Sequence, residues 1–67
     1  MANNLQISLA AARVNAGLTQ DDVAKALRVT KNTVVAWEKG SSEPKITQAR
    51  ALSTLYDMPL DCIFFTH

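Results

Sequence analysis

Residues 19–44 read TQDDVAKALRVTKNTVVAWEKGSSEP, and this stretch decides the fold. It predicts two short helices. Thr19 is a good N-cap for a helix over residues 20–27, because its hydroxyl can accept a hydrogen bond from a free backbone N–H in the first turn. Thr30 stands in the same relation to a helix over residues 31–39. The two helices are therefore separated by a connection of only about three residues.

A connection of this length is typical of a helix-turn-helix, in which the two helices cross at about 90–120°. The crossing requires a small residue where the helices meet, and Ala24 provides a methyl group at that place. Val23, Val34 and Trp37 are expected to face the shared core, with Val29 filling the corner. The remaining surface of the helix over residues 31–39 is polar or small and covers nothing, which makes it a candidate binding face.

The rest of the chain shows helical spacing of apolar residues, and strands find little support. A first helix is expected within residues 3–17, with Asn3 or Asn4 as its N-cap. A fourth helix is expected over residues 47–57 with Thr47 as a possible cap. A short fifth helix is expected after Pro59, carrying Leu60, Ile63 and Phe64. The predicted fold class is all-α: five short helices in a single domain over residues 1–67.

Composition excludes several classes of protein. The chain has 67 residues and a net charge of +1, and its single cysteine, Cys62, allows no internal disulfide. Since the single histidine, His67, is terminal, we expect no metal site and no cofactor. No apolar run reaches the ~20 residues that span a membrane, and the N-terminus lacks the pattern of a signal peptide. We therefore expect a cytoplasmic protein with no membrane partner and no small-molecule ligand.

The middle of the chain is modestly basic. Residues 28–50 contain five basic and two acidic side chains, which is a weak indication of an anionic partner. The sequence offers no paired His and acid, no Cys and His arrangement and no phosphate-cradling glycine loop, so an enzyme is not expected.

The stretch over residues 19–44 resembles the helix-turn-helix of the lambda-repressor-like, Cro/repressor (XRE) family. The resemblance extends upstream to ARVNAGLTQ and downstream to LSTLYDMPLDCIF, nearly the whole chain. One position departs from the pattern, because Arg28 stands where the family usually has glycine. The residues that carry the resemblance in the helix-turn-helix are Thr19-Gln20, Val23-Ala24, Leu27, Val29-Thr30, Thr33-Val34 and Trp37-Glu38-Lys39-Gly40.

The resemblance implies that residues 31–39 are a recognition helix whose exposed face enters the DNA major groove. Lys31 can donate to guanine O6 and N7, and Asn32 can pair with adenine N6 and N7. Small apolar side chains can touch thymine methyl groups. The alternative is that Lys31 and Asn32 are ordinary solvated residues of a first helical turn. The predicted base-contacting residues are Lys31, Asn32, Thr33, Val35 and Ala36.

Phosphate contacts are expected from residues on either side of this helix. The resemblance gives Gln20 such a role, at a helix start whose free N–H groups favour an anion. The others follow the recognition helix, where ordinary turn chemistry and a solvated loop charge are the alternatives. The predicted phosphate-contacting residues are Gln20, Lys39, Ser41, Ser42 and Lys45.

Two further sets of residues have structural roles in this interpretation. By resemblance, Arg13 and Glu38 form a partly buried ion pair between the first and third helices, for which the planar guanidinium is suited. The alternative is an exposed pair that contributes little. Surplus apolar residues near the C-terminus predict a dimer interface, or else they close the core of a monomer. The predicted interface residues are Leu60, Ile63, Phe64 and Phe65.

The predicted function is a small, sequence-specific transcriptional regulator: a Cro-like repressor that binds palindromic operator DNA as a homodimer. Double-stranded DNA is the expected partner, and a prophage origin is implied by resemblance alone. The alternative is an antirepressor or modulator that binds another regulator through the C-terminal apolar patch.

Overall fold

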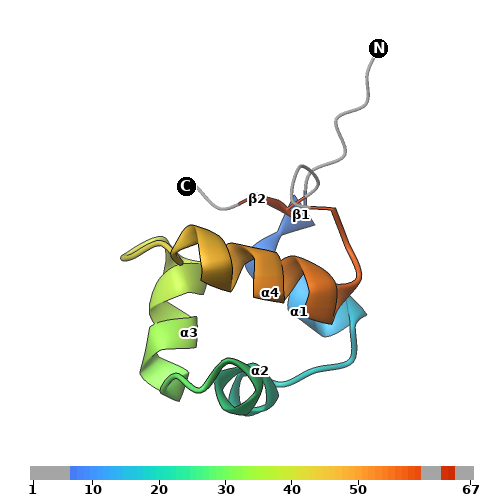
Figure 1. The fold of residues 1–67 in the computed structure, drawn as a ribbon. Coiled ribbons are helices and arrows are strands. Elements are labelled where there is room, and N and C mark those ends of the chain that lie inside the picture. The colour runs from blue at the N-terminus through green and yellow to red at the C-terminus, as the bar shows by residue number, and fades with distance from the viewer. Residues whose placement is uncertain (1–6, 60–62, 65–67) are drawn as a thin grey trace.

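The computed structural model describes residues 7–59 and 63–64. Within these residues the chain forms four helices and two very short strands (Figure 1). Their order is β1 (Ile7–Ser8), α1 (Leu9–Asn15), α2 (Gln20–Leu27), α3 (Lys31–Lys39), α4 (Ile46–Tyr56) and β2 (Ile63–Phe64). No helix among the described residues is long and apolar enough to cross a membrane.

Polar residues start the helices that build the corner. The Thr19 hydroxyl accepts from the Asp22 N–H at 3.0 Å, and the Asp22 carboxylate accepts from the Thr19 N–H at 2.9 Å. These two bonds form a capping box at the start of α2, and they hold the pKa of Asp22 below its usual value. At α3 the Thr30 hydroxyl accepts from the Thr33 N–H at 3.2 Å. Both caps lie where the sequence predicts them.

All four described helices end in the same way. A residue in the left-handed conformation directly follows α2, α3 and α4, and it is the second residue after α1. The N–H of the residue after it donates to the carbonyl five residues back. Glycine takes the left-handed position after α1 and α3, whereas Arg28 and Asp57 take it after α2 and α4. The closing bonds are Leu18 to Arg13, Val29 to Ala24, Ser41 to Ala36 and Met58 to Ser53, at 2.9–3.2 Å.

The two strands correct the prediction at both ends of the chain. Ile63–Phe64 is extended, so the expected fifth helix is wrong there, and it pairs in parallel with Ile7–Ser8. The first helix accordingly begins after Ser8, whose hydroxyl accepts from the Ala11 N–H at 3.0 Å, and not at an asparagine cap before Leu5. The physical reason is that Ile7 finds Ile63 across the fold, a backbone pairing that local spacing cannot reveal.

The fourth helix also begins slightly earlier than predicted. Its N-cap is Lys45, and the Lys45 backbone N–H donates to Gln48 Oε1 at 2.8 Å. Thr47 therefore lies inside α4 and does not cap it.

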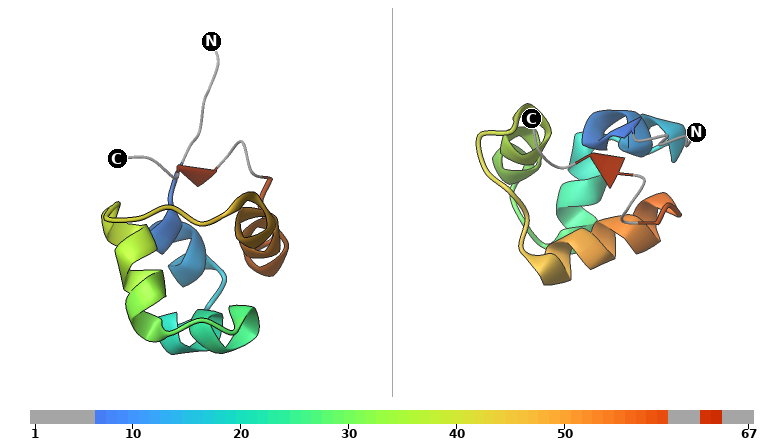
Figure 2. Two further views of the ribbon diagram at one scale, coloured as in Figure 1. Left: turned by 60° about the vertical axis from the view of Figure 1, so that its left-hand side comes forward. Right: turned by 90° about the horizontal axis from the view of Figure 1, so that it is seen from above.

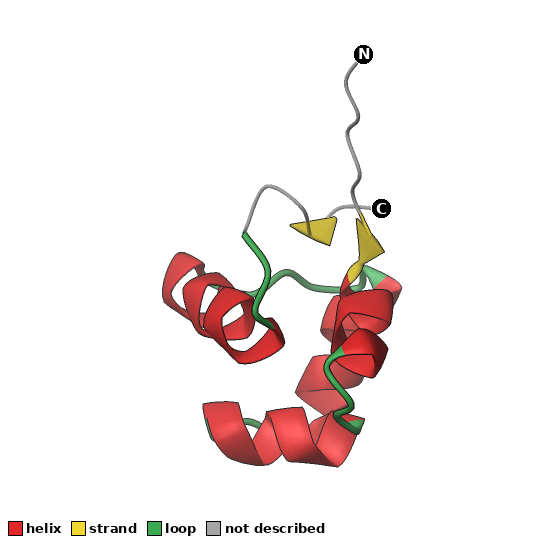
Figure 3. Ribbon diagram, turned by 90° about the vertical axis from the view of Figure 1, so that its right-hand side faces the viewer, coloured by secondary structure: helices red, strands yellow, loops and turns green. Residues whose placement is uncertain are grey.

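One core joins the four helices. The structure places α2 at one end of the molecule and the two strands at the opposite end (Figures 1 and 3). Between them α1, α3 and α4 surround the interior (Figure 2). The buried residues that form this core are Leu9, Ala12, Val23, Ala24, Val34, Trp37, Leu52 and Tyr56. The all-α helix-turn-helix fold is thus confirmed, with a small parallel strand pair added to it.

Candidate functional site

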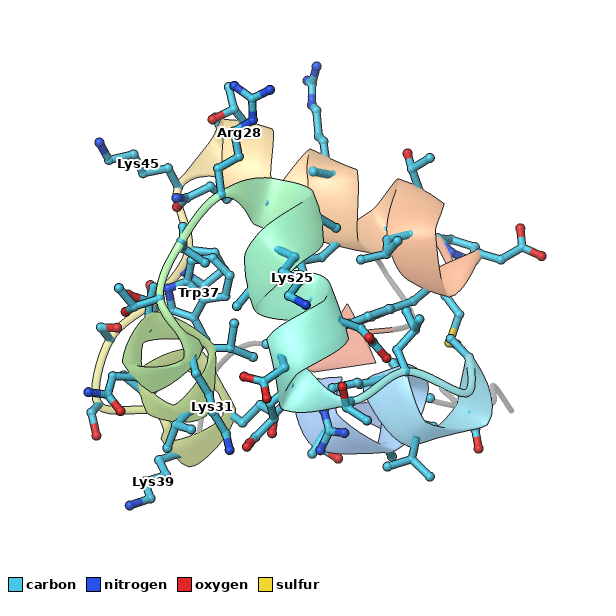
Figure 4. All side chains as sticks on the ribbon, turned by 90° about the horizontal axis from the view of Figure 1, so that it is seen from below. Lys25, Arg28, Lys31, Trp37, Lys39 and Lys45 are labelled. Carbon is cyan, nitrogen blue, oxygen red and sulfur yellow. The ribbon has the colours of Figure 1, made fainter. Side chains whose placement is uncertain are left out.

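The helix α3 has one face in the core and one face outside. Val34 is 1% exposed and Trp37 is 5% exposed, so these two residues anchor the helix. Lys31 and Asn32 are exposed, and Thr33, Val35 and Ala36 are half-buried. Figure 4 shows the Lys39 side chain extending from α3 away from the body of the molecule. The helix therefore presents a surface that no other described element covers.

The crossing of α2 and α3 sets the direction of that surface. Ala24 is 6% exposed and belongs to the core, and Val23 and Val34 are fully buried beside it. Val29 packs against the same core from the turn. A side chain larger than methyl at Ala24 would press on neighbours that are already close-packed.

The turn between these helices contains a residue in a costly conformation. Arg28 has φ 59° and ψ 43°, which is the left-handed region. A side chain other than glycine pays about 1–2 kcal/mol there. The turn is nevertheless closed in the usual way, because the Val29 N–H donates to the Ala24 carbonyl at 2.9 Å. The chain thus tolerates the strain and keeps the short turn.

A charged network ties three helices together behind α3. Arg13 Nε donates to Glu38 Oε2 at 2.7 Å, and Arg13 Nη2 lies 3.4 Å from Glu38 Oε1. Arg13 Nη1 also donates to the Leu18 carbonyl at 3.0 Å, which fixes the connection between α1 and α2. The hydrogen bond with Glu38 raises the pKa of Arg13, against the opposing effect of its burial. The structure therefore brings together the two residues predicted to pair.

The same carboxylate has a third partner that sequence reasoning missed. Gln20 Nε2 donates to Glu38 Oε1 at 2.9 Å, from the first turn of α2. The amide oxygen and the second N–H of Gln20 take no part in this bond. No sequence signal pointed to it, because the two residues are 18 positions apart and on different helices.

The remaining predicted phosphate contacts lie at the end of α3 and in the loop that follows it. Lys39, Ser41, Ser42 and Lys45 are all exposed. The Ser41 N–H closes α3 by donating to the Ala36 carbonyl at 2.9 Å, so its backbone has a structural role while its side chain stays outside. The hydroxyl of Thr33, by contrast, lies 3.0 Å from that of Thr30 and is part of the α3 cap.

Comparison with known proteins agrees with this geometry. A family model described as helix-turn-helix matches residues 9–61. The chain belongs to this helix-turn-helix family. The match covers every described helix, from the first residue of α1 to beyond α4.

Two relatives of this helix-turn-helix chain are transcriptional regulators by name. The cryptic phage CTXphi transcriptional repressor RstR of Vibrio cholerae is 40% identical over 48 residues, covering 72% of this chain and 43% of the relative. The uncharacterized HTH-type transcriptional regulator MJ0272 of Methanocaldococcus jannaschii is 36% identical over 47 residues, covering 70% of this chain and 71% of the relative. The chain thus spans less than half the length of the Vibrio protein. No solved structure matches it.

Tyr56 lies in the core of this helix-turn-helix domain with an unusual hydroxyl. The residue is 4% exposed, and its hydroxyl has no hydrogen-bond partner among the described residues. Burial raises the pKa of Tyr56 to about 12; the charge of Glu38 adds to this effect and that of Arg13 opposes it. The helical spacing of the sequence leaves open whether Leu55 or Tyr56 faces inward, and it gives no sign that Tyr56 lies close to the ion pair.

The predicted dimer interface is only partly visible. Leu60 and Phe65 lie outside the described residues, as do Cys62 and His67. Ile63 and Phe64 form β2, at the opposite end of the helix-turn-helix domain from α2 (Figure 3). Within residues 7–59 and 63–64, no group of His, Cys, Asp and Glu side chains could hold a metal ion.

Proposed function

We propose that this chain is a sequence-specific, DNA-binding transcriptional regulator that reads base pairs in the major groove with α3. The observation that supports this most is the division of α3 into two faces: Val34 and Trp37 are buried, while Lys31 and Asn32 are exposed. An α-helix fits the width of the major groove, and side chains near the start of a recognition helix reach base edges.

The exposed groups on α3 suit base recognition. Lys31 donates hydrogen bonds and prefers guanine O6 and N7, whereas the Asn32 amide pairs with adenine N6 and N7. Val35 and Ala36 offer apolar contact to thymine methyl groups. Thr33 contributes at the border of this face through its methyl group, because its hydroxyl lies against that of Thr30.

Phosphate contacts fix the register of the helix in the groove. We assign them to Gln20 at the start of α2 and to Lys39, Ser41, Ser42 and Lys45 at and after the end of α3. Gln20 can serve both purposes. One N–H holds Glu38, and the other polar atoms of the amide are left for the phosphate.

A homodimer on a palindromic operator follows from the same proposal. We assign the contact between subunits to Leu60, Ile63, Phe64 and Phe65. β2 lies at the opposite end of the molecule from α2, so a second copy packed there would be remote from the start of α3, which lies beside α2 (Figure 1). The two recognition helices would then enter half-sites about 34 Å apart. The name of the Vibrio relative favours repression, and a phage setting, as the biological role.

Selection of bound DNA from a pool of random duplexes tests the proposal. The selection is done at about 50 mM and about 200 mM salt, where phosphate-dominated affinity differs strongly. We expect an enriched motif with twofold symmetry at both. A pool that shows no enrichment at either salt concentration contradicts the proposed function and favours a modulator that acts by binding another protein.

A further inference from the structure

We propose that Arg28 contacts a DNA phosphate beside the recognition helix, and that the fold accepts a strained backbone to place its guanidinium there. This inference rests on the proposed function and deepens it by adding a DNA-contacting residue. The turn itself does not require an arginine at position 28. It is carried by three observations: the backbone of Arg28, the surroundings of its side chain and the arrangement of cations around α3.

The backbone gives no reason for an arginine at this position. The closing bonds of α2 require a left-handed residue at position 28, and glycine serves the same purpose at the ends of α1 and α3. Asp57 takes the equivalent place after α4, but aspartate adopts this region more readily than other side chains. Arginine lacks that preference, so glycine would satisfy the turn with less strain.

The side chain of Arg28 faces solvent. Arg28 is exposed, and in the part of the chain that the structure describes no carboxylate pairs with it. A strained backbone that holds an unengaged, solvent-facing cation is the pattern expected of a functional residue.

The position of Arg28 completes an arrangement of four cations around α3. Lys31 begins the helix and Lys39 ends it, while Arg28 precedes it and Lys45 follows it. Figure 4 looks toward α2 and the start of α3. It shows Arg28 and Lys45 extending on the side of α3 on which Trp37 lies, and Lys31 and Lys39 extending on the opposite side. A helix in the major groove has a phosphate backbone on each side.

This arrangement gives each backbone a cation near both ends of the helix. Without Arg28, the side marked by Lys45 has a cation only after the end of α3. A guanidinium suits a phosphate particularly well, because its planar fork can donate two parallel hydrogen bonds. Arg28 therefore fits a backbone phosphate of the strand that passes the start of α3.

The test is the variant Arg28→Gly, in which stability and DNA affinity are expected to change in different directions. Removing the strained side chain should leave the melting temperature unchanged or raise it by up to about 5 °C. The dissociation constant for the selected duplex and for an unrelated duplex should both rise, by about two- to tenfold. The slope of log affinity against log salt should become shallower by about 0.9, the value for one phosphate contact.

Two further variants separate a local contact from a general charge effect. Arg28→Lys keeps the cation and should keep most of the affinity. Lys25→Gln removes the same charge from the exposed face of α2 and should have a clearly smaller effect than Arg28→Gly. Equal losses in Arg28→Gly and Lys25→Gln would overturn the inference, as would an unchanged affinity and salt slope in Arg28→Gly.

The result also distinguishes this inference from the proposed function. If the pool selection yields a motif but Arg28→Gly binds like the wild type, the inference falls and the function stands. If no motif is enriched yet Arg28→Gly weakens binding to any duplex, sequence-specific reading falls and the phosphate contact stands. A wild-type protein that binds no duplex overturns both.

Discussion

Arg13 on α1 and Glu38 on α3 meet at 2.7 Å, with side chains only 16% and 8% exposed. Glu38 follows directly after Trp37, so the pair holds α3 at the point where its buried anchor lies. Gln20 reaches the same carboxylate from α2. One acidic side chain therefore fixes α3 against both helices behind it, and the orientation of the proposed recognition face depends on it.

A double-mutant cycle measures this dependence. Arg13→Met should lower the free energy of unfolding by about 2–3 kcal/mol, because it leaves a largely buried carboxylate without its charged partner. Glu38→Gln should cost about as much, since it leaves the guanidinium unpaired. The double variant should be less destabilised than the sum, with a coupling energy of about 1–3 kcal/mol in urea unfolding. A coupling energy within about 0.5 kcal/mol of zero would mean that the pair is only a surface contact.

Tyr56 gives a second prediction, because its buried hydroxyl has no described partner. Tyr56→Phe removes an unsatisfied polar group and keeps the ring, so stability at pH 7 should be unchanged or raised by about 1 kcal/mol. Tyr56→Ala is the contrasting variant and should cost about 3–5 kcal/mol, since it leaves a cavity in the core. A large loss in Tyr56→Phe would show that the hydroxyl has a bonding partner after all.

The same residue predicts a change in stability at alkaline pH. The pKa of Tyr56 is about 12 in the folded protein and about 10 when unfolded. The unfolded state therefore releases the proton first, and the stability contributed by the neutral hydroxyl falls as the pH rises from about 10 to 12. In urea unfolding over this range, Tyr56→Phe should lose less stability than the wild type. Parallel curves for the two proteins would contradict the raised pKa.

Ala24 tests whether the crossing angle of α2 and α3 matters for binding. Ala24→Leu inserts a larger side chain between packed helices and should cost about 1–3 kcal/mol of stability. It should also reduce DNA affinity at temperatures where the variant is fully folded, because α3 is pushed out of line. Ala26→Leu changes an exposed position of the same helix and should alter neither property strongly. DNA affinity that stays normal in folded Ala24→Leu protein would show that the groove tolerates a changed angle.

Much of this fold is predictable from local sequence because its signals are local. Thr19, Thr30 and Gly40 bound the two central helices through hydrogen bonds to neighbours within a few residues. The strand pair is different, since Ile7 and Ile63 are 56 positions apart in the sequence and each satisfies the backbone of the other's strand. Apolar residues at Leu60, Ile63 and Phe64 fit helical spacing equally well, so the pattern alone could not choose.

Some features of the candidate site likewise follow from local sequence, whereas others depend on how distant segments pack. Which residues of α3 point outward follows from the positions of Val34 and Trp37, and this could be worked out from spacing. The link from Gln20 to Glu38 requires knowing how α2 sits against α3. The conformation of Arg28 lies between these cases. The energetic cost of a left-handed Arg28 could be anticipated from the short turn. Only the structure shows that Arg28 adopts this conformation and that the turn is not built differently.

Asn32 and Lys45 separate base reading from phosphate binding in a single experiment. Both are exposed, Asn32 on α3 and Lys45 at the end of the following loop. Asn32→Ala should lower discrimination at one base position of the selected motif by about 1–3 kcal/mol and leave the salt dependence nearly unchanged. Lys45→Ala should weaken all duplexes alike and make the salt slope shallower by about 1. Competition binding with single-base variants of the motif, at two salt concentrations, measures both effects. If Asn32→Ala weakens every duplex equally, α3 does not read bases through this amide.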